Sequence, residues 1–221
     1  MIDFEIPAAT KALRDEIRAF VTDKVVPYET DPRLTRHGPD EDLRTELVSL
    51  ARDAGLLTFQ AQRRFGGREP SHVEQAVLFE AAGWSTLGPI ALNCAAPDEG
   101  NMFLLSKIAN DVQTQRFLVP VINGAQRSVF AMTEPGGAGS DPNQLNTTAV
   151  FDGTNYVING CKWLITGANG ARTWIVMARV APNEFGADGP TLFLCDRDTP
   201  GIEIERGMNT RDRNYVGGPA V

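Results

Sequence analysis

Residues 130–141, with the sequence FAMTEPGGAGSD, combine residue types that could bind a phosphate or the polar edge of a ring. A short apolar run leads to Thr133, then to a turn with three glycines, and Ser140 and Asp141 follow. Glycines let backbone amides come close to a ligand, and neighbouring hydroxyl groups supply further hydrogen bonds. The segment therefore predicts a ligand-binding turn, and a tight surface turn between strands is the alternative interpretation.

Two further segments contain polar groups that could serve a ligand. Residues 159–168 read NGCKWLITGA, and residues 93–102 read NCAAPDEGNM. On chemistry alone, Trp163 is more typical of a core than of a cofactor platform, and Thr166 is typical of any strand. The second segment reads as a loop that enters a helix with Asp98 as its N-cap. Neither segment identifies a ligand by itself.

Several common catalytic and nucleotide-binding patterns are absent. The sequence lacks the GxGxxG and GxxxxGK[ST] nucleotide motifs and the GxSxG, HExxH and SxxK catalytic motifs. Its three cysteines and two histidines have no metal-ligand spacing and suggest no disulfide framework. We therefore expect buried free thiols in a reducing compartment, and we assign no metal ligand.

The composition excludes other classes of protein. The 221 residues are 42% hydrophobic and 22% charged, as in an ordinary soluble globular chain. The net charge is −7 and no basic run is present, which argues against nucleic-acid binding. No stretch approaches the roughly 20 apolar residues of a membrane-spanning helix. No secretory or transit leader precedes Phe4, so we expect a cytoplasmic protein, with a processed form in the mitochondrial matrix as the alternative.

Helices are predicted for the part of the chain before residue 124. Apolar residues recur at spacings of three and four over residues 8–26, 40–55 and 71–84, with shorter stretches around 102–108 and 117–122. Asp40 is the expected N-cap of the second helix, and Ser71 with Glu74 forms a capping-box pattern before the third. We expect Pro27 to end the first helix and Gly55 to end the second.

Strands are predicted for the remainder of the chain. Short β-type runs cover residues 128–132, 148–151, 156–158, 163–166, 174–180 and 191–195, with a weaker run at 202–204. No helical pattern separates them, which favours an antiparallel sheet over a parallel one. We therefore expect an α+β protein, with a helical domain at residues 1–124 and a barrel-like or sandwich-like β domain at residues 125–221. Residues 215–221 read as a strand in an incomplete sheet or as a disordered tail.

The motifs, taken in order along the whole chain, resemble the acyl-CoA dehydrogenase flavoprotein family. The resemblance rests on a helical start, then TEP before a glycine turn ending in Gly139-Ser140, then NGxKxxIT at residues 159–166. Residues 93–102 and the Lys162-Trp163 pair are most similar to its long-chain branch, which acts in fatty-acid oxidation. The resemblance implies three domains, with FAD as cofactor and acyl-CoA as substrate. It also implies electron-transfer flavoprotein as a partner and assembly into homo-oligomers.

The family's reaction implies roles for particular residues here. A carboxylate removes the α-proton of the thioester while the β-hydrogen leaves as hydride to the flavin. Matched to the family motifs, Met132 and Thr133 would bind the pyrimidine edge of the flavin, and Gly139 and Ser140 would bind the pyrophosphate. Thr166 would lie beside flavin N5, with Ile165 next to it. Leu164 would lie against the ring, and Phe130 would lie near the flavin. Ser140 would also border the bound acyl-CoA.

The sequence departs from the family pattern in three respects. The glycine turn has one residue more than usual, at Gly137-Ala138. The aromatic residue that covers the flavin aligns with Leu164, while Trp163 lies one place earlier and is expected in the core. The C-terminal helical domain that carries the catalytic carboxylate is absent, and Glu134 is expected to be structural. We therefore assign no catalytic residue and expect the isolated chain to be inactive.

Two other interpretations of the same scaffold remain open at this point. One is a related flavoprotein oxidase or monooxygenase, because the residues retained here do not separate it from a dehydrogenase. The other is a non-catalytic flavin- or CoA-binding module that pairs with another chain through its unfinished sheet.

Overall fold

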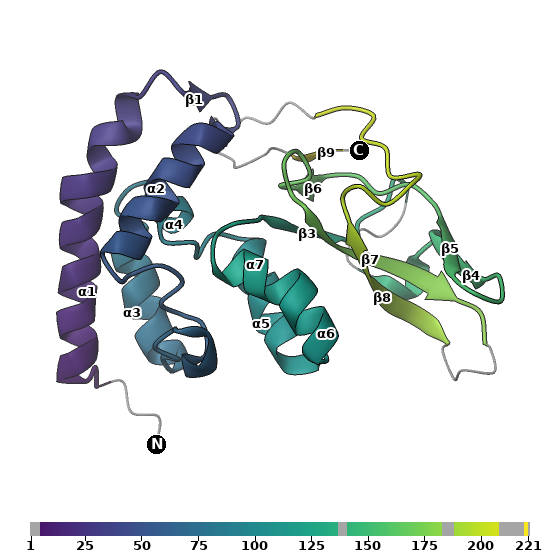
Figure 1. Ribbon diagram of the computed structural model, residues 1–221, viewed down its shortest axis with the longest axis horizontal. Coiled ribbons are helices and arrows are strands. Elements are labelled where there is room, and N and C mark those ends of the chain that lie inside the picture. The colour runs from purple at the N-terminus through teal and green to yellow at the C-terminus, as the bar shows by residue number, and fades with distance from the viewer. Residues whose placement is uncertain (1–4, 137–140, 183–187, 208–218, 221) are drawn as a thin grey trace. The chain divides into compact units, whose positions relative to one another are not determined.

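The computed structural model describes residues 5–136, 141–182, 188–207 and 219–220. The chain forms two compact units, Met1–Ala125 and Gln126–Val221. The first is helical and the second is built on a sheet (Figure 1). Among the described residues, no helix combines the length and apolar character needed to cross a bilayer.

The first unit consists of short helices and one small hairpin. Helix α1 packs against α3, and α2 packs against α4 (Figure 1). The elements are α1 (Ala8–Phe20), β1 (Leu34–Thr35), β2 (Gly38–Pro39), α2 (Glu41–Asp53), α3 (His72–Ala82), α4 (Gly88–Ala91), α5 (Asp98–Ile108), α6 (Asp111–Gln113) and α7 (Val119–Ile122).

The first predicted helix is longer and less regular than expected. It is α-helical over Ala8–Phe20, passes through a π turn at Val21–Val25, and continues as a 3₁₀ segment, Val26–Thr30. Pro27 therefore lies near the start of a helical turn, where its missing N–H costs no hydrogen bond, and it does not end the helical path. The predicted apolar stripe is buried as expected, with Ile17 fully excluded from solvent.

Local capping explains where several helices begin. Asp40 accepts a hydrogen bond from the Leu43 N–H at 2.9 Å, and Ser71 and Glu74 form the predicted capping box. A second capping box, between Asn110 and Gln113, was not predicted. Asp98 is not the N-cap of α5, because the helix already includes it and Pro97 occupies the cap position without a side-chain bond.

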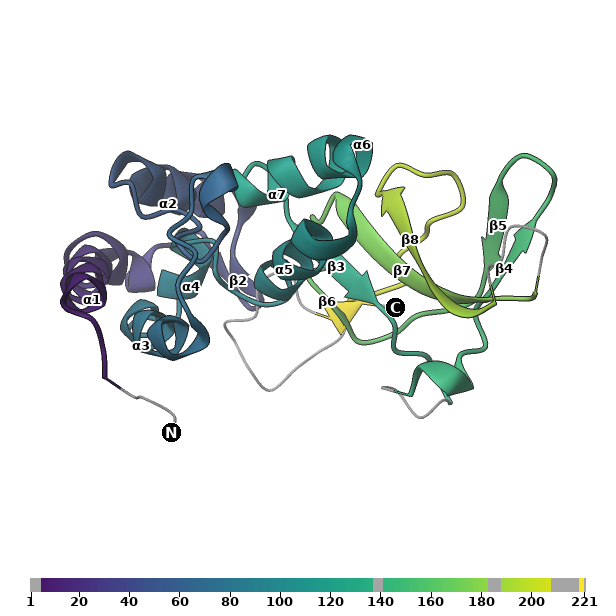
Figure 2. The same cartoon turned by 90° about the horizontal axis from the view of Figure 1, so that it is seen from below.

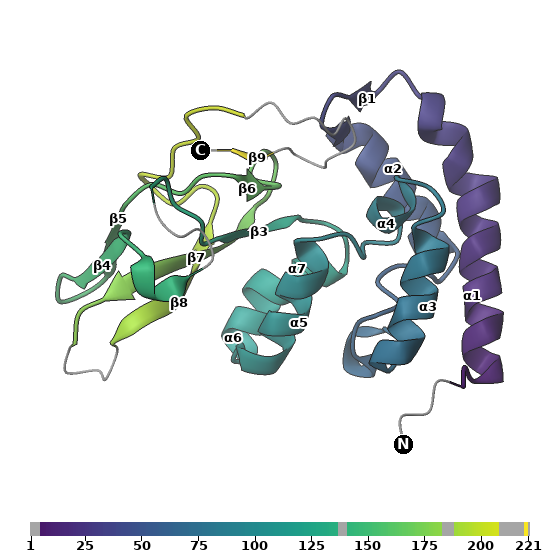
Figure 3. The ribbon, with the colours of Figure 1, turned by 180° about the vertical axis from the view of Figure 1, so that it is seen from behind.

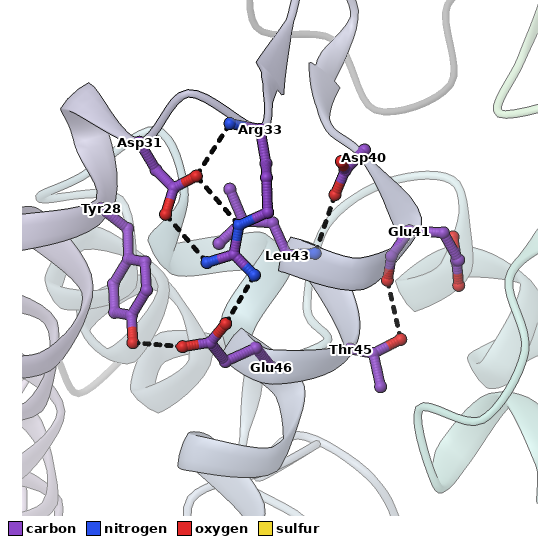
Figure 4. A network of polar contacts seen from close by, with 8 residues as sticks. All are labelled: Tyr28, Asp31, Arg33, Asp40, Glu41, Leu43, Thr45 and Glu46. Carbon is purple, nitrogen blue, oxygen red and sulfur yellow. Dashed lines mark hydrogen bonds and ion pairs between the residues drawn. The ribbon is translucent and has the colours of Figure 1, made fainter.

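A polar network joins the β1–β2 hairpin to α2 (Figure 4). The Tyr28 hydroxyl donates to one oxygen of Glu46 at 2.6 Å, and Arg33 donates to the other at 2.7 Å. Arg33 also pairs with Asp31 at 2.8 Å. These bonds lower the pKa of Glu46, the Tyr28 bond being the largest cause, and the same bond raises the pKa of Tyr28. The network thereby links the segment before the hairpin to α2 through Glu46.

The loop that contains Asn93 is held by a buried polar cluster. Asn93 and Thr58 both have positive φ, and both are buried. The Asn93 amide donates to the Thr58 hydroxyl at 2.9 Å and to the Val121 carbonyl at 2.8 Å, while the Thr58 hydroxyl donates to the Ile122 carbonyl at 2.7 Å. This part of the 93–102 segment therefore has a structural role at the end of α7.

In the second unit, β7 is the strand around which the sheet is built, and Figure 2 shows it beside β8, its antiparallel neighbour. β3 pairs with β7 from Ser128↔Thr173 onward, β4 pairs with β7 near its end, and β5 pairs with β4. The strands are β3 (Ser128–Ala131), β4 (Thr148–Phe151), β5 (Tyr156–Asn159), β6 (Ile165–Thr166), β7 (Thr173–Val180), β8 (Gly189–Asp196) and β9 (Pro219–Ala220).

The α+β class is confirmed, but the sheet is mixed and not purely antiparallel. β4–β5 and β7–β8 are antiparallel, whereas β3–β7 and β4–β7 are parallel. Parallel neighbours need a long crossover, usually a helix. Here the connection from β3 to β7 carries β4, β5 and β6 instead, so the absence of a helical pattern did not exclude parallel pairing. The described strands form no closed barrel.

The core of this unit lies on one face of the sheet and opens into a groove of about 570 Å³ that is lined by both apolar and polar residues. Residues 202–204, predicted as a weak strand, are irregular and line the groove. Other lining residues include Ala131, Ile158, Trp174, Val176 and Cys195. Of the strand expected at 215–221, Pro219–Ala220 pairs with β6 as β9, and the rest lies outside the described residues.

Candidate flavin-binding site

The structure brings two of the predicted site segments together. Figure 3 shows β3 and β6 side by side, and their residues are in contact. Beyond the end of β3, the Trp163 N–H donates to the Thr133 carbonyl at 3.0 Å. One residue earlier, the Lys162 ammonium donates to the Met132 carbonyl at 2.9 Å. Met132 and Thr133 therefore adjoin the segment that leads into Ile165–Thr166.

A buried ion pair reinforces this junction. Glu134 is 5% exposed, and its carboxylate accepts from Lys162 at 2.7 Å, from the Asn146 N–H at 2.6 Å and from the Thr147 N–H at 2.9 Å. Burial alone would raise the pKa of Glu134, but the Lys162 ammonium and the two amides outweigh burial and lower it to about 2. The carboxylate is thus ionised and its oxygens are occupied, as expected of a structural residue.

Burial acts differently on the lysine of this pair. Loss of hydration lowers the pKa of Lys162, although the Glu134 carboxylate opposes that change. Its side chain is only 11% exposed. Lys162 belongs to the NGxK motif, but sequence reasoning gave it no role at the site. The signal available in the sequence was a charged residue directly before an apolar run.

The chain turns sharply at Leu164. This residue has φ +56°, in the left-handed region, and its side chain is 46% exposed, whereas Ile165 is 4% exposed. The left-handed residue interrupts the extended backbone, so the strand predicted at 163–166 begins only at Ile165. Trp163, expected in the core, is half-buried.

The other predicted residues are placed as follows. Phe130 lies within β3 and is half-buried, and Met132 and Thr133 follow the strand and are also half-buried. Thr166 is half-buried in β6. Gly139 and Ser140 lie outside the described residues, so the predicted pyrophosphate contact has no structural account.

The donor set at the junction suits the polar edge of a planar aromatic ligand. Among the described residues, no hydrogen-bond partner is found for the N–H or hydroxyl of Thr133 or for the hydroxyl of Thr166. The exposed Leu164 side chain adds apolar surface close by in the chain. An isoalloxazine ring has hydrogen-bond acceptors along one edge and flat apolar faces, so these residues fit its requirements.

Comparisons with known proteins identify the family of both units. Residues 7–125 match the family profile of the acyl-CoA dehydrogenase N-terminal domain, and residues 129–213 match that of the acyl-CoA dehydrogenase middle domain. The chain is 37% identical over 214 residues to a Mycobacterium tuberculosis protein assigned as the acyl-CoA dehydrogenase FadE2, covering 93% of this chain and 52% of the relative.

Solved structures have the same fold. A Mycobacterium abscessus structure assigned as an acyl-CoA dehydrogenase is 33% identical, with a TM-score of 0.86 over 98% of this chain and 57% of that one. A glutaryl-CoA dehydrogenase from Mycobacterium smegmatis, solved in complex with FADH2, has a TM-score of 0.76 at 23% identity over 98% of this chain and 53% of that one. The chain thus spans about half the length of these three relatives.

Proposed function

The chain belongs to the acyl-CoA dehydrogenase family, and on this premise we propose that its second unit contributes to an FAD site. We propose further that the whole protein performs α,β-dehydrogenation of an acyl-CoA thioester. The observation that carries the proposal is the junction of the two motif segments, in which Trp163 bonds to Thr133 and Lys162 bonds to Met132.

Each proposed contact follows from the chemistry of its side chain or amide. Thr133 would hold the pyrimidine edge of the flavin through its N–H and hydroxyl, and Met132 would lie beside it. Thr166 would donate its hydroxyl near flavin N5, while Leu164 and Ile165 provide the apolar surroundings and Phe130 lies in the adjoining strand. When bound, FAD supplies the acceptor for a hydride.

The phosphate and thioester contacts are also part of the proposal. Gly139 and Ser140 would meet the FAD pyrophosphate, and Ser140 would also border the acyl-CoA, as the family motif implies. We assign no catalytic base to this chain. Glu134 is unsuited to that role, because Lys162 and two backbone amides already occupy its oxygens and its pKa lies near 2.

The proposal extends to partners and compartment at the level of the family. The whole protein would pass electrons to an electron-transfer flavoprotein and assemble as a homo-oligomer. Its compartment would be the cytoplasm or the mitochondrial matrix. The M. smegmatis relative with the same fold was solved with FADH2, which supports FAD as the cofactor class.

An equilibrium titration of FAD fluorescence tests the site. Thr133→Val and Thr166→Val each remove one hydroxyl with little change in shape, and each should weaken FAD binding about five- to tenfold. Thr148→Val, at an exposed position in β4, is the matched control and should bind as tightly as the parent chain. Equal affinities for all three variants would contradict the proposed site.

A further inference from the structure

We propose that Lys162 is a positioning residue that fixes the direction of the Thr133 N–H, and that Glu134 holds Lys162 for this task. This inference rests on the proposed flavin site, in which the Thr133 N–H donates to the cofactor. It assigns a role to a charged pair whose two members are not themselves expected to touch the flavin.

The peptide group between Met132 and Thr133 is planar, so its carbonyl and its N–H cannot turn independently. The carbonyl of Met132 and the N–H of Thr133 belong to one peptide unit, which is planar and in which the two bonds point in opposite directions. Lys162 donates to that carbonyl at 2.9 Å. Fixing the oxygen on one side therefore fixes the N–H on the other.

A second bond fixes the next peptide unit. The Trp163 N–H donates to the Thr133 carbonyl at 3.0 Å. Consecutive carbonyls of Met132 and Thr133 are therefore both bound by consecutive residues of the 162–163 segment. Thr133 is thereby held at both of its peptide units, although it lies beyond the end of β3 and has no ladder partner in the sheet.

Glu134 explains how a flexible lysine can serve as a fixed support. A lysine side chain normally retains many rotamers, and ordering it costs entropy. Here the ammonium bridges the Met132 carbonyl and the Glu134 carboxylate, and Glu134 is itself held by the amides of Asn146 and Thr147. The pair is almost excluded from water, so its bonds are weakly screened.

The charge of Lys162 also makes the peptide a better donor. A cation on the carbonyl oxygen polarises the amide and strengthens the N–H of the same unit as a donor. The polarisation acts where the flavin edge is proposed to lie. Lys162 would thus influence both the direction and the strength of the Thr133 contact.

Variants must avoid leaving a single buried charge, since an unpaired buried ion destabilises a fold severely. The double variant Glu134→Gln/Lys162→Met neutralises both partners at once and retains similar side-chain volumes. Lys11→Met, at an exposed position in α1, is the control for a lysine-to-methionine change away from this pair. A thermal melt of each variant establishes that it is folded before binding is measured.

Amide NMR of the chain without FAD reads out the positioning directly. We expect the order parameter of the Thr133 amide to fall from a rigid value near 0.85 towards 0.6 in the double variant, and the Trp163 N–H to exchange faster with solvent. Lys11→Met should change neither signal. A Thr133 amide as rigid in the double variant as in the parent chain would overturn the proposal.

FAD titration then separates this inference from the proposed site. We expect FAD affinity to fall at least tenfold in the double variant, and the shift of the Thr133 amide resonance on FAD addition to be lost. If the parent chain binds FAD and the variant binds equally well with a mobile Thr133, the positioning role is wrong while the site stands. If the parent chain itself does not bind FAD, the proposed site fails, and the positioning of Thr133 is still decided by the spectra without ligand.

Discussion

At the scale of single residues, Glu134 makes the second unit sensitive to acid. Its carboxylate is 5% exposed and is held by Lys162 and two backbone amides. Its pKa lies near 2 in the folded chain, against an ordinary value of 4.5. The folded state therefore binds this proton later than the unfolded chain does as the pH falls.

The sign of the resulting pH dependence follows from that difference. The stability due to Glu134 is fully present above about pH 4.5 and is lost as the pH falls towards 2. We predict that Glu134→Gln lowers the free energy of unfolding by about 3 kcal/mol at pH 7, and that this deficit shrinks steadily below pH 4.5. Urea denaturation of parent and variant across this range measures the difference. A deficit that stays constant down to pH 2 would disprove the assignment.

Part of the arrangement at the candidate site was predictable at this scale. Thr133 and the Ile165–Thr166 pair were placed near one another by resemblance, and Glu134 was predicted to be structural. The identity of the partners was not predictable, because Lys162, Asn146 and Thr147 are brought to Glu134 by the sheet. The left-handed conformation of Leu164 was also not predictable, since leucine rarely adopts it.

At the scale of elements, α2 is capped at its N-terminus by Asp40, and its arginines bind carbonyls that follow α7. From the same helix, Arg44 donates to the Gly124 carbonyl at 3.0 Å and Arg52 donates to the Asn123 carbonyl at 2.7 Å. Carbonyls at the end of a helix lack partners within the helix, so these two arginines satisfy groups that would otherwise need water.

The capping of α2 gives a prediction for helix stability. Asp40→Ala removes the acceptor for the Leu43 N–H, and we expect a loss of about 1 kcal/mol in the free energy of unfolding of this unit. Asp42→Ala, in the exposed first turn of the same helix, removes a carboxylate without removing a cap and should cost less than about 0.5 kcal/mol. Urea denaturation followed by circular dichroism compares them, and equal losses would refute the capping role.

Elements with a strong local signal were predicted well, and those fixed by distant contacts were not. The capping box at Ser71 and the strand Thr148–Phe151 depend on neighbouring residues, and both are present. The parallel pairing of β3 with β7 depends on residues far apart in sequence, and periodicity contains no information about it. The same reason accounts for the missing strand at 202–204.

At the scale of the whole molecule, the chain combines a helical unit with a sheet unit whose apolar core opens into a groove. The chain belongs to the acyl-CoA dehydrogenase family but spans about half the length of the M. tuberculosis and M. abscessus relatives. The activity of the whole protein therefore stays a proposal. Binding of FAD by the second unit can be measured on this chain alone. It depends on Met132–Thr133 and Leu164–Thr166 acting as one surface.

The most direct test is a ¹H–¹⁵N correlation spectrum of the 221-residue chain recorded while FAD is added, because it detects weak binding and locates it. If the second unit holds the flavin edge as proposed, saturable shifts will cluster on residues 130–133 and 163–166, with little change along the helices of the first unit. Shifts that are absent from both segments at saturating FAD, or that fall mainly elsewhere, would contradict that proposal.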